Sequence, residues 1–386
     1  MISPDIQQRL VDIRRDIHQH PELSWQESRT AAKVCQALDE IGLPYRSNVG
    51  ETGVVAEIAG RKKGPYIALR ADMDALPIVE DTGLSFSSQV EGVMHACAHD
   101  GHTSMLLGAA MLLSKGEPPP LPVRLIFQPA EETVLGAKRL IDEGVLEDVA
   151  MIFGGHIDRH YPCGSLIVTE GAVNASSDKF SIEISGQGGH AARPHEAIDA
   201  VVVGSLLVIS LQTIVSREIN PAHPSVVSIG RFDAGTAGNV IAGHALLEGS
   251  IRAQDPEVRN DLHNSIRRIT DSVAQLHDAE IKVEIRKGPP PLINTDEMTA
   301  LARKAALQTV DKDKVMKLFT ANMGGEDFAY YLDHVPGCYI RYGAQIPGRE
   351  GYPAHSSRFD FDEEALGIGA VYLATVAREA ASLVDS

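Results

Sequence analysis

Residues 95–102 read HACAHDGH and place three histidines, one cysteine and one aspartate in eight consecutive positions. The whole chain has only 15 histidines and 4 cysteines in 386 residues, so this concentration needs a reason. Cys97 and His99 precede an apolar, helix-like run, and a thiolate with an imidazole suits zinc or a similar divalent ion. Cys-x-His alone does not separate a metal site from a buried cysteine beside surface histidines.

A second group of chemically able residues is the sequence QPAEE, in which Glu131 and Glu132 follow a short apolar run. Burying unpaired carboxylates is costly, so a buried pair of glutamates needs a partner such as a cation. One glutamate could then bind metal while the other acts as a general base toward water. A solvated acidic loop is the alternative. His156 in IFGGHID and His355 in GYPAHSSRFD complete the set of candidate ligands.

The elements that must position these groups are short apolar runs separated by helical patterns. The runs are YIALRADMDAL, VRLIFQPAEE, AMIFGGHID and GCYIRYGA, and each ends in, or shortly precedes, polar residues of the kinds described above. Such runs predict buried parallel strands of an α/β sheet. Because ligands bind outside the carboxyl ends of such strands, the pattern favours an enzyme.

Residues 176–288 have a different pattern. Half-exposed strands such as DKFSIEISG and EIKVEIRKG alternate apolar and polar residues, and two helices intervene, the second beginning at Asp255-Pro256. The order β-α-β-β-α-β predicts a ferredoxin-like unit, which ends at the stiff sequence GPPP. We therefore expect an α/β catalytic domain with a mostly parallel central sheet, formed by 1–175 and 289–386. An α+β lid or dimerisation domain, 176–288, interrupts it.

Charge and composition argue against several classes of partner. The net charge is −17 and no cluster of Lys and Arg appears, which argues against nucleic acid. The four cysteines are scattered and the N-terminus lacks a signal-peptide core, so we expect a cytoplasmic protein. The apolar stretch 197–215 carries Asp199 and Gln212, so a buried or interface helix is favoured over a membrane span.

The motifs of this chain resemble those of the M20 metallopeptidases. The resemblance is to the amidohydrolase branch, which includes hippurate hydrolases, N-acyl amino acid deacylases and plant auxin-conjugate hydrolases. It runs nearly end to end through RRDIHQHPELSWQE, LRADMDALPI, MHACAHDGHTSMLLGAA, FQPAEE, GGHID, GQGGHAARPH, GTAGNVI, GGEDFAYY and AHSSRFDFDE. It implies hydrolysis of an N-acyl amino acid, or a related small amide conjugate, to a carboxylic acid and an amino acid.

The resemblance also implies a site with two divalent metal ions. Cys97 would be the bridging ligand, and the other ligands would be His99, Glu132, His156 and His355. Glu131 would be the general base. Asp74 would orient the ligands, a role for which Asp72 competes. Zinc suits these ligands best, with manganese, cobalt and nickel as alternatives.

Three residues of the inserted domain match positions that act on substrate in relatives. His190 would stabilise the oxyanion, which in some relatives it does across a dimer. Asn239 would contact the substrate carbonyl region, and Arg252 the carboxylate. Taken alone, His190 also fits a loop histidine, and Arg252 an arginine on the solvated face of a strand. The apolar helix at 196–218 could supply the surface of a homodimer.

Two departures from the family pattern stand out. Ala98 replaces the usual glycine between the cysteine and the histidine, and we expect alanine to be tolerated there only at negative φ. Ala242-Gly243-His244 replaces a proline and an acid beside the expected substrate clamp. A dipeptidase or aminoacylase of the same superfamily is an alternative function. A metal-binding relative without turnover is a second alternative, against which the intact Glu131–Glu132 pair argues.

Overall fold

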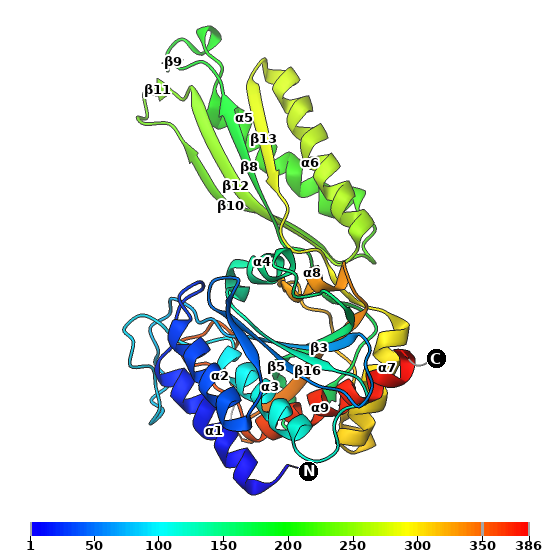
Figure 1. Ribbon diagram of the computed structural model, residues 1–386. Coiled ribbons are helices and arrows are strands. Elements are labelled where there is room, and N and C mark those ends of the chain that lie inside the picture. The colour runs from blue at the N-terminus through cyan, green and yellow to red at the C-terminus, as the bar shows by residue number, and fades with distance from the viewer. Residues whose placement is uncertain (1, 349–350, 385–386) are drawn as a thin grey trace. The chain divides into compact units, whose positions relative to one another are not determined.

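The computed structural model describes residues 2–348 and 351–384, and the chain divides into two units (Figure 1). The first unit comprises Met1–Gly171, Ile293–Thr320 and Asp327–Ser386. The second unit, Ala172–Leu292 with Ala321–Glu326, interrupts the first in sequence. Each unit has its own cluster of buried apolar side chains.

The first unit is built on an eight-stranded sheet in the order β1-β2-β4-β3-β5-β16-β6-β15. Its centre is formed by β4 (Val123–Gln128), β3 (Tyr66–Asp72), β5 (Val149–Pro162) and β16 (Gly337–Gln345), and neighbouring central strands run parallel. The outer strands are β1 (Tyr45–Val49), β2 (Gly53–Ile58), β6 (Leu166–Ile167) and β15 (Val315–Met316). The four apolar runs of the sequence are these central strands, so the α/β prediction is confirmed.

Helices cover both faces of this sheet (Figure 1). One face carries α1 (Pro4–Gln19), α2 (Ser28–Ile41), α3 (His99–Ser114), α7 (Asp296–Thr309) and α9 (Glu364–Val384). The short helices α4 (Gly136–Asp142) and α8 (Phe328–Leu332) contact each other and the strands β4 and β5, respectively.

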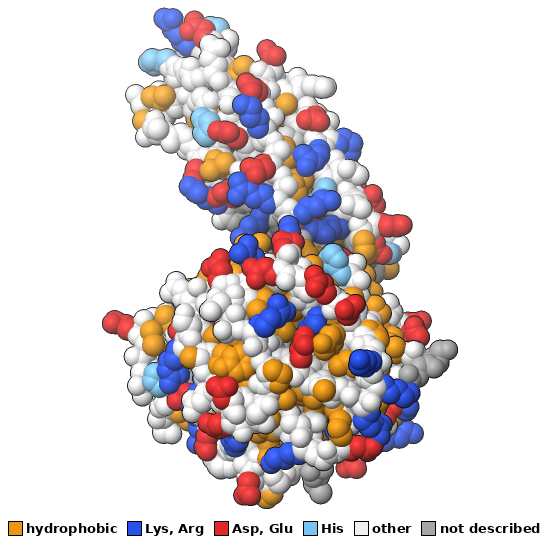
Figure 2. Space-filling view, viewed as in Figure 1, with side chains coloured by type: hydrophobic (Ala, Val, Ile, Leu, Met, Phe, Trp, Pro, Cys, Tyr) orange, Lys and Arg blue, Asp and Glu red, His pale blue; other side chains and the backbone are white. Residues whose placement is uncertain are grey.

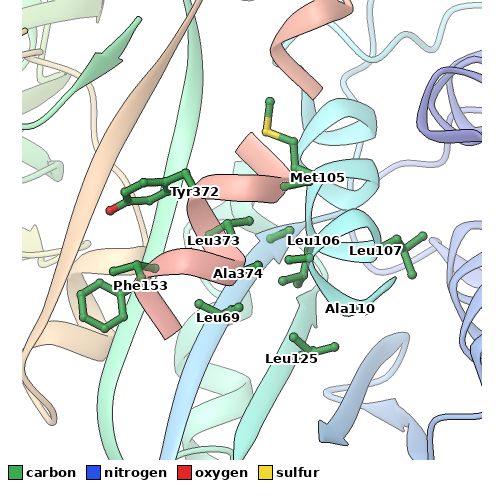
Figure 3. Close-up of a cluster of buried hydrophobic side chains, with 14 of the residues drawn as sticks. Leu69, Met105, Leu106, Leu107, Ala110, Leu125, Phe153, Tyr372, Leu373 and Ala374 are labelled. Carbon is green, nitrogen blue, oxygen red and sulfur yellow. The ribbon is translucent and has the colours of Figure 1, made fainter. Parts of the chain in front are cut away.

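The core of the first unit lies between α3, α9 and the central strands. Figure 3 shows Leu106 and Ala110 of α3 beside Leu373 of α9, over the strand residues Leu69 and Leu125. A Cβ added at Gly108 would lie 2.6 Å from the Cβ of Ala370, so glycine at this position allows α3 and α9 to approach closely. α3 is buried along nearly its whole length, which fixes the direction of its first turn.

The second unit contains a four-stranded antiparallel sheet in the order β10-β12-β8-β13. Along the chain its elements are β8 (Asp178–Ser185), α5 (Ala200–Thr213), β10 (Ser225–Ala234), β12 (His244–Ala253), α6 (Pro256–His277) and β13 (Glu280–Arg286). The Asp255 side chain accepts hydrogen bonds from the first turn of α6, as expected for a cap. The predicted β-α-β-β-α-β order is confirmed.

Four short strands complete the fold. β9 (Gly189–His190) pairs with β11 (Val240–Ile241), and β7 (Gly171–Asn174) pairs with β14 (Leu292–Asn294). On the face shown in Figure 2, acidic and basic side chains are interspersed on both units.

Two described helices, Ala200–Glu218 and Glu364–Val384, are long and apolar enough to cross a membrane by length and composition. The first buries Val203, Leu207 and Leu211 in the core of the second unit. The second buries Leu366, Ala370 and Leu373 in the core of the first unit. Packing within the units therefore accounts for these residues, whereas Val202 and Ile209 of the first helix stay exposed, so its apolar character is only partly explained by burial.

A buried cluster of charged side chains around Asp178 connects the beginning and the end of the inserted unit. Asp178, at the start of β8, accepts hydrogen bonds from Arg259 (2.8 Å) and His263 (2.7 Å) of α6 and from the backbone N–H of Gly288 (2.9 Å). Burial favours the neutral acid, but these donors outweigh it and lower the pKa of Asp178 to about 2. The ionised carboxylate thus stabilises the unit where the chain enters and leaves it.

We expect Asp178→Asn to lower the free energy of unfolding by about 2 kcal/mol at pH 7. The folded pKa of Asp178 lies below the unfolded value, so this contribution is complete above about pH 4 and is lost as pH falls toward 2. Chemical denaturation of both proteins between pH 7 and pH 2.5 measures it. A difference that stays constant over this range would contradict the assignment.

Candidate metal centre

The candidate ligands come from the carboxyl-terminal edge of the central strands. Cys97 precedes α3, and His99 is its first residue. Glu132 lies in a single 3₁₀ turn, Glu131–Thr133, directly after β4, and His156 lies within β5. His355 follows β16, and its backbone N–H donates to the carbonyl of Ala96 at 2.8 Å, which holds it beside the cysteine.

These residues form two groups that share Cys97. In one, the ligand atoms of Cys97, His99 and His156 lie within 4.8 Å of one another, and in the other so do those of Cys97, Glu132 and His355. The Cys97 Sγ to His156 Nε2 distance is 3.3 Å, and His355 Nε2 lies 3.5 Å from Glu132 Oε2. All five residues belong to the first unit.

The donor atoms of this site fit divalent cations. His99 Nε2 and Glu132 Oε1 are buried and have no hydrogen-bond partner among the described residues, whereas most buried polar atoms are paired. Burial and the neighbouring glutamates raise the pKa of the Cys97 thiol well above its ordinary value. A coordinated cation offsets both effects, because it pairs the orphaned atoms and favours the thiolate.

Hydrogen bonds fix which nitrogen each histidine presents. Nδ1 of His99 lies 2.9 Å from the carbonyl oxygen of Asp74, and Nδ1 of His156 lies 2.7 Å from that of Ile157. Since a carbonyl only accepts, Nδ1 carries the proton in both rings and Nε2 is left for a metal. In His102 both nitrogens are used, Nδ1 by Asp72 at 2.6 Å and Nε2 by the N–H of Ile157 at 2.9 Å.

Asp74 and Asp72 make different contacts. Asp74 Oδ1 lies 3.1 Å from His99 Nδ1, and its two oxygens accept the backbone N–H groups of Glu131 (3.1 Å) and Glu132 (3.0 Å). Asp72 instead binds His102 and the guanidinium of Arg70, the latter at 2.6 Å. Asp74 therefore makes the contacts that an orienting residue for His99 needs.

Glu131 is buried, with 7% of the residue exposed, and its side chain turns toward the same cluster. Its Oε2 lies 4.0 Å from His99 Nε2, and Oε1 accepts the backbone N–H of Asp327 at 3.4 Å. A buried carboxylate beside the candidate ligands, but not needed to complete either group around Cys97, is suited to exchange protons with water.

The expectation that Ala98 needs negative φ is wrong. Ala98 has φ 67°, in the left-handed region, and Ala130 (φ 54°) and His355 (φ 66°) share this conformation. All three adjoin or belong to the candidate site. Left-handed backbone costs about 1–2 kcal/mol at a non-glycine residue, so the site stores strain that the surrounding structure must hold.

The candidate substrate residues lie in the second unit and fall into two places. His190 pairs with Val240 across β9 and β11, and the N–H of Ala191 donates to the carbonyl of Asn239 at 3.3 Å. Both His190 and Asn239 are exposed. Arg252 lies near the far end of β12, whose opposite end, His244, follows β11. At about 3.3 Å per residue, Arg252 is roughly 26 Å along the strand from His244.

Sequence reasoning assigned no role to Ser24 and Glu27, although both contact the site. The Ser24 hydroxyl donates to Asp74 at 2.7 Å, and Glu27 accepts the N–H of Ala130 at 2.9 Å. Their only signal was the motif HPELSWQE, which carries no metal-ligand or catalytic spacing of its own.

Comparison with known proteins gives the same family over most of the chain. The model of the peptidase family M20/M25/M40 matches residues 68–379. The N-acetyl-L-cysteine deacetylase of Bacillus subtilis is 40% identical over 94% of this chain and 85% of its own length. The hippurate hydrolase of Campylobacter jejuni is 38% identical over 97% of both chains.

A solved structure agrees. The Bacillus subtilis YXEP protein, described as a dinuclear metal binding peptidase from the M20 family, superposes with a TM-score of 0.86. Its sequence is 36% identical, and the match covers 98% of this chain and 99% of that one. The α/β architecture with its insertion is therefore that of M20 peptidases.

We expect Ala98→Gly to raise the free energy of unfolding by about 1 kcal/mol, because glycine adopts the left-handed backbone at no steric cost. Ala110→Gly, within the same helix, is the control and should lower it by about 1 kcal/mol or more. Thermal and chemical denaturation measure both. Destabilisation by Ala98→Gly as large as that of the control would show that Ala98 is not strained.

Proposed function

The chain belongs to the peptidase family M20/M25/M40, and on this premise we propose that it is a binuclear metal-dependent amidohydrolase of N-acyl amino acids or related small amide conjugates. The products are a carboxylic acid and an amino acid. The observation that carries the proposal is the pair of ligand groups that share Cys97, with Glu131 beside them. The names of the deacetylase and the hippurate hydrolase support the substrate class.

We assign two divalent ions to the site, with zinc preferred and manganese, cobalt or nickel as alternatives. The residues that would hold them are Cys97, which belongs to both ligand groups, with His99, Glu132, His156 and His355. When bound, the ions polarise the scissile carbonyl and make water more acidic. Asp74 orients His99 through its Nδ1 and leaves Nε2 for the metal.

Glu131 is the proposed general base. Its carboxylate takes a proton from the attacking water and passes it to the nitrogen of the leaving amino acid as the C–N bond breaks. One carboxylate can serve both steps, first as a base and then as an acid. The hydrogen bond from the backbone N–H of Asp327 to Oε1 of Glu131 keeps this oxygen in place, while Oε2 faces the candidate ligands.

Arg252 supports recognition of a carboxylate by the second unit. It is half-buried on β12, and no hydrogen bond or ion pair to another described residue involves its side chain. Burial lowers the pKa of Arg252, so an anionic partner would offset the cost of its buried charge. The free carboxylate of an N-acyl amino acid is such a partner, and guanidinium binds it through two parallel hydrogen bonds.

We further propose that the protein acts as a cytoplasmic homodimer. His190 and Asn239 lie at β9 and β11, which precede the His244 end of β12, whereas Arg252 lies near the other end, so we infer that one small substrate does not touch all three in a single copy. A second copy could supply His190 and Asn239 to the site. Val202, Leu206 and Ile209 form one exposed apolar face of α5, with Ile209 66% exposed, and would be covered in such a dimer.

The test of the activity is amino-acid release from N-acetyl, N-benzoyl and indoleacetyl amino acids and from dipeptides. We expect the metal-loaded protein to release amino acids from at least one conjugate, and the chelated protein to release none until metal returns. Glu131→Gln should lower kcat at least about 100-fold, as expected when a general base is lost.

The outcomes separate the alternatives. Amino-acid release from dipeptides alone would favour a dipeptidase function. Metal binding without release from any substrate would contradict an enzyme function. Glu143→Gln changes an exposed glutamate of the same unit outside the candidate metal centre; it is the control and should leave kcat unchanged.

The test of the dimer is complementation between two inactive variants. Glu131→Gln and His190→Ala, co-expressed with different affinity tags, should form mixed dimers in which one site has both groups intact. Random pairing then restores about a quarter of the wild-type activity. If His190 served its own copy, each site would lack one group and mixing would restore nothing.

A further inference from the structure

The segment Glu22–Glu27 of the motif HPELSWQE lies against the loops that carry the candidate ligands. The carbonyl of Glu22 accepts the N–H of Ala75 at 2.8 Å, and the Ser24 hydroxyl donates to Asp74. Glu27 is fully buried, and its two oxygens accept the N–H of Ala130 at 2.9 Å and the hydroxyl of Thr52 at 2.6 Å. All these residues belong to the first unit.

Two buried carboxylates accept hydrogen bonds from three successive backbone N–H groups in the loop after β4, residues 130–133, which we call the catalytic loop. Glu27 takes the N–H of Ala130, and Asp74 takes those of Glu131 and Glu132. Charge-assisted bonds of this kind are stronger than those between neutral groups. The backbone that presents the general base and a metal ligand is thus fixed from two sides.

The hydrogen bond from the N–H of Ala130 to Glu27 lies at a residue whose backbone conformation is unfavourable. Ala130 has φ 54° and ψ 40°, a left-handed conformation that an alanine avoids. Without the bond, relaxation of Ala130 toward negative φ would turn the following peptide and move both glutamates. Displacement of a catalytic group by about 1 Å can cost about 100-fold in rate.

A capping role for Glu27 does not explain these contacts. Glu27 is the N-cap residue of α2, yet its side chain makes no hydrogen bond to that helix. The carboxylate of Glu22 does so instead, and accepts the N–H groups of Arg29 (2.9 Å) and Thr30 (2.8 Å). The Glu27 side chain therefore does not cap α2, although Glu27 occupies the N-cap position.

We propose that Glu27 is a positioning residue for the catalytic loop, which acts through the N–H of Ala130 on Glu131 and Glu132. The inference rests on the proposed function, because it assigns the loop a general base and a metal ligand. Glu27 itself touches neither substrate nor metal. Loss of its oxygen should lower kcat and disturb the metal site while substrate binding changes little.

The experiment compares three variants of the full-length protein. Glu27→Ala removes the acceptor, and Glu27→Gln keeps an oxygen that can still accept the N–H of Ala130. Thr52→Val is the matched control, because it removes the other hydrogen bond of Glu27 and leaves the Ala130 bond in place. If Glu27→Ala does not fold, Glu27→Asp, which withdraws the carboxylate by one methylene, replaces it.

Two readouts are measured with Co²⁺ as the probe metal. We expect Glu27→Ala to lower kcat about 10–100-fold with KM within about threefold, and to weaken Co²⁺ binding or shift its visible absorption spectrum. Glu27→Gln and Thr52→Val should keep kcat within about threefold and leave the cobalt spectrum unchanged, whatever their melting temperatures.

The spectrum separates this inference from the proposed activity. A cobalt spectrum altered only in Glu27→Ala, in a protein that hydrolyses no conjugate, would support positioning while the proposed function fails. Equal kcat and equal spectra for Glu27→Ala and Thr52→Val would overturn the positioning role. So would a loss in Glu27→Gln as large as that in Glu27→Ala, because the buried charge rather than the hydrogen bond would then be responsible.

Discussion

The carboxylate of Asp74 is the interaction on which the site depends. It is buried, and it binds the ring of His99, the hydroxyl of Ser24 and the N–H groups of two consecutive glutamates. Burial alone would raise the pKa of Asp74, but these donors hold it below its ordinary value, so the group stays charged. One carboxylate thereby connects the end of β3, the start of α3 and the loop after β4. These contacts explain why a short 3₁₀ turn can hold two glutamates in fixed positions.

The sequence predicted that these polar residues lie at the carboxyl ends of parallel strands, but not which contacts they make there. Apolar runs followed by Asp74, Glu132 or His156 indicated parallel strands, and a parallel sheet brings its carboxyl ends to one edge whatever the loops do. The family motifs then named the residues at that edge. Likewise, the alternation in β8 and β13 and the cap at Asp255 sufficed for the inserted unit, because period and capping are local properties.

The features that escaped prediction are those decided by tertiary contacts. Nothing local in HPELSWQE shows that Glu27 leaves its own helix and reaches Ala130, more than 100 residues away. Ala98 was expected at negative φ because alanine prefers it, but the burial of α3 and the contacts of His99 outweigh that preference. The separation of Arg252 from His190 could not be read from motifs either, since motif order does not say which end of β12 a residue occupies.

The division of the chain into two units separates two kinds of requirement. The five candidate ligands, Glu131 and the supporting carboxylates all lie in the first unit, where buried hydrogen bonds fix His99 and the backbone of Ala130 and Glu131. Strain at Ala98 and Ala130 is tolerated there because those bonds over-determine the backbone. His190, Asn239 and Arg252 lie in the second unit, which has its own core, and share none of these bonds. Substitutions in the inserted unit can therefore be made without altering the backbone that holds the candidate ligands, whereas the first unit allows little variation around Asp74.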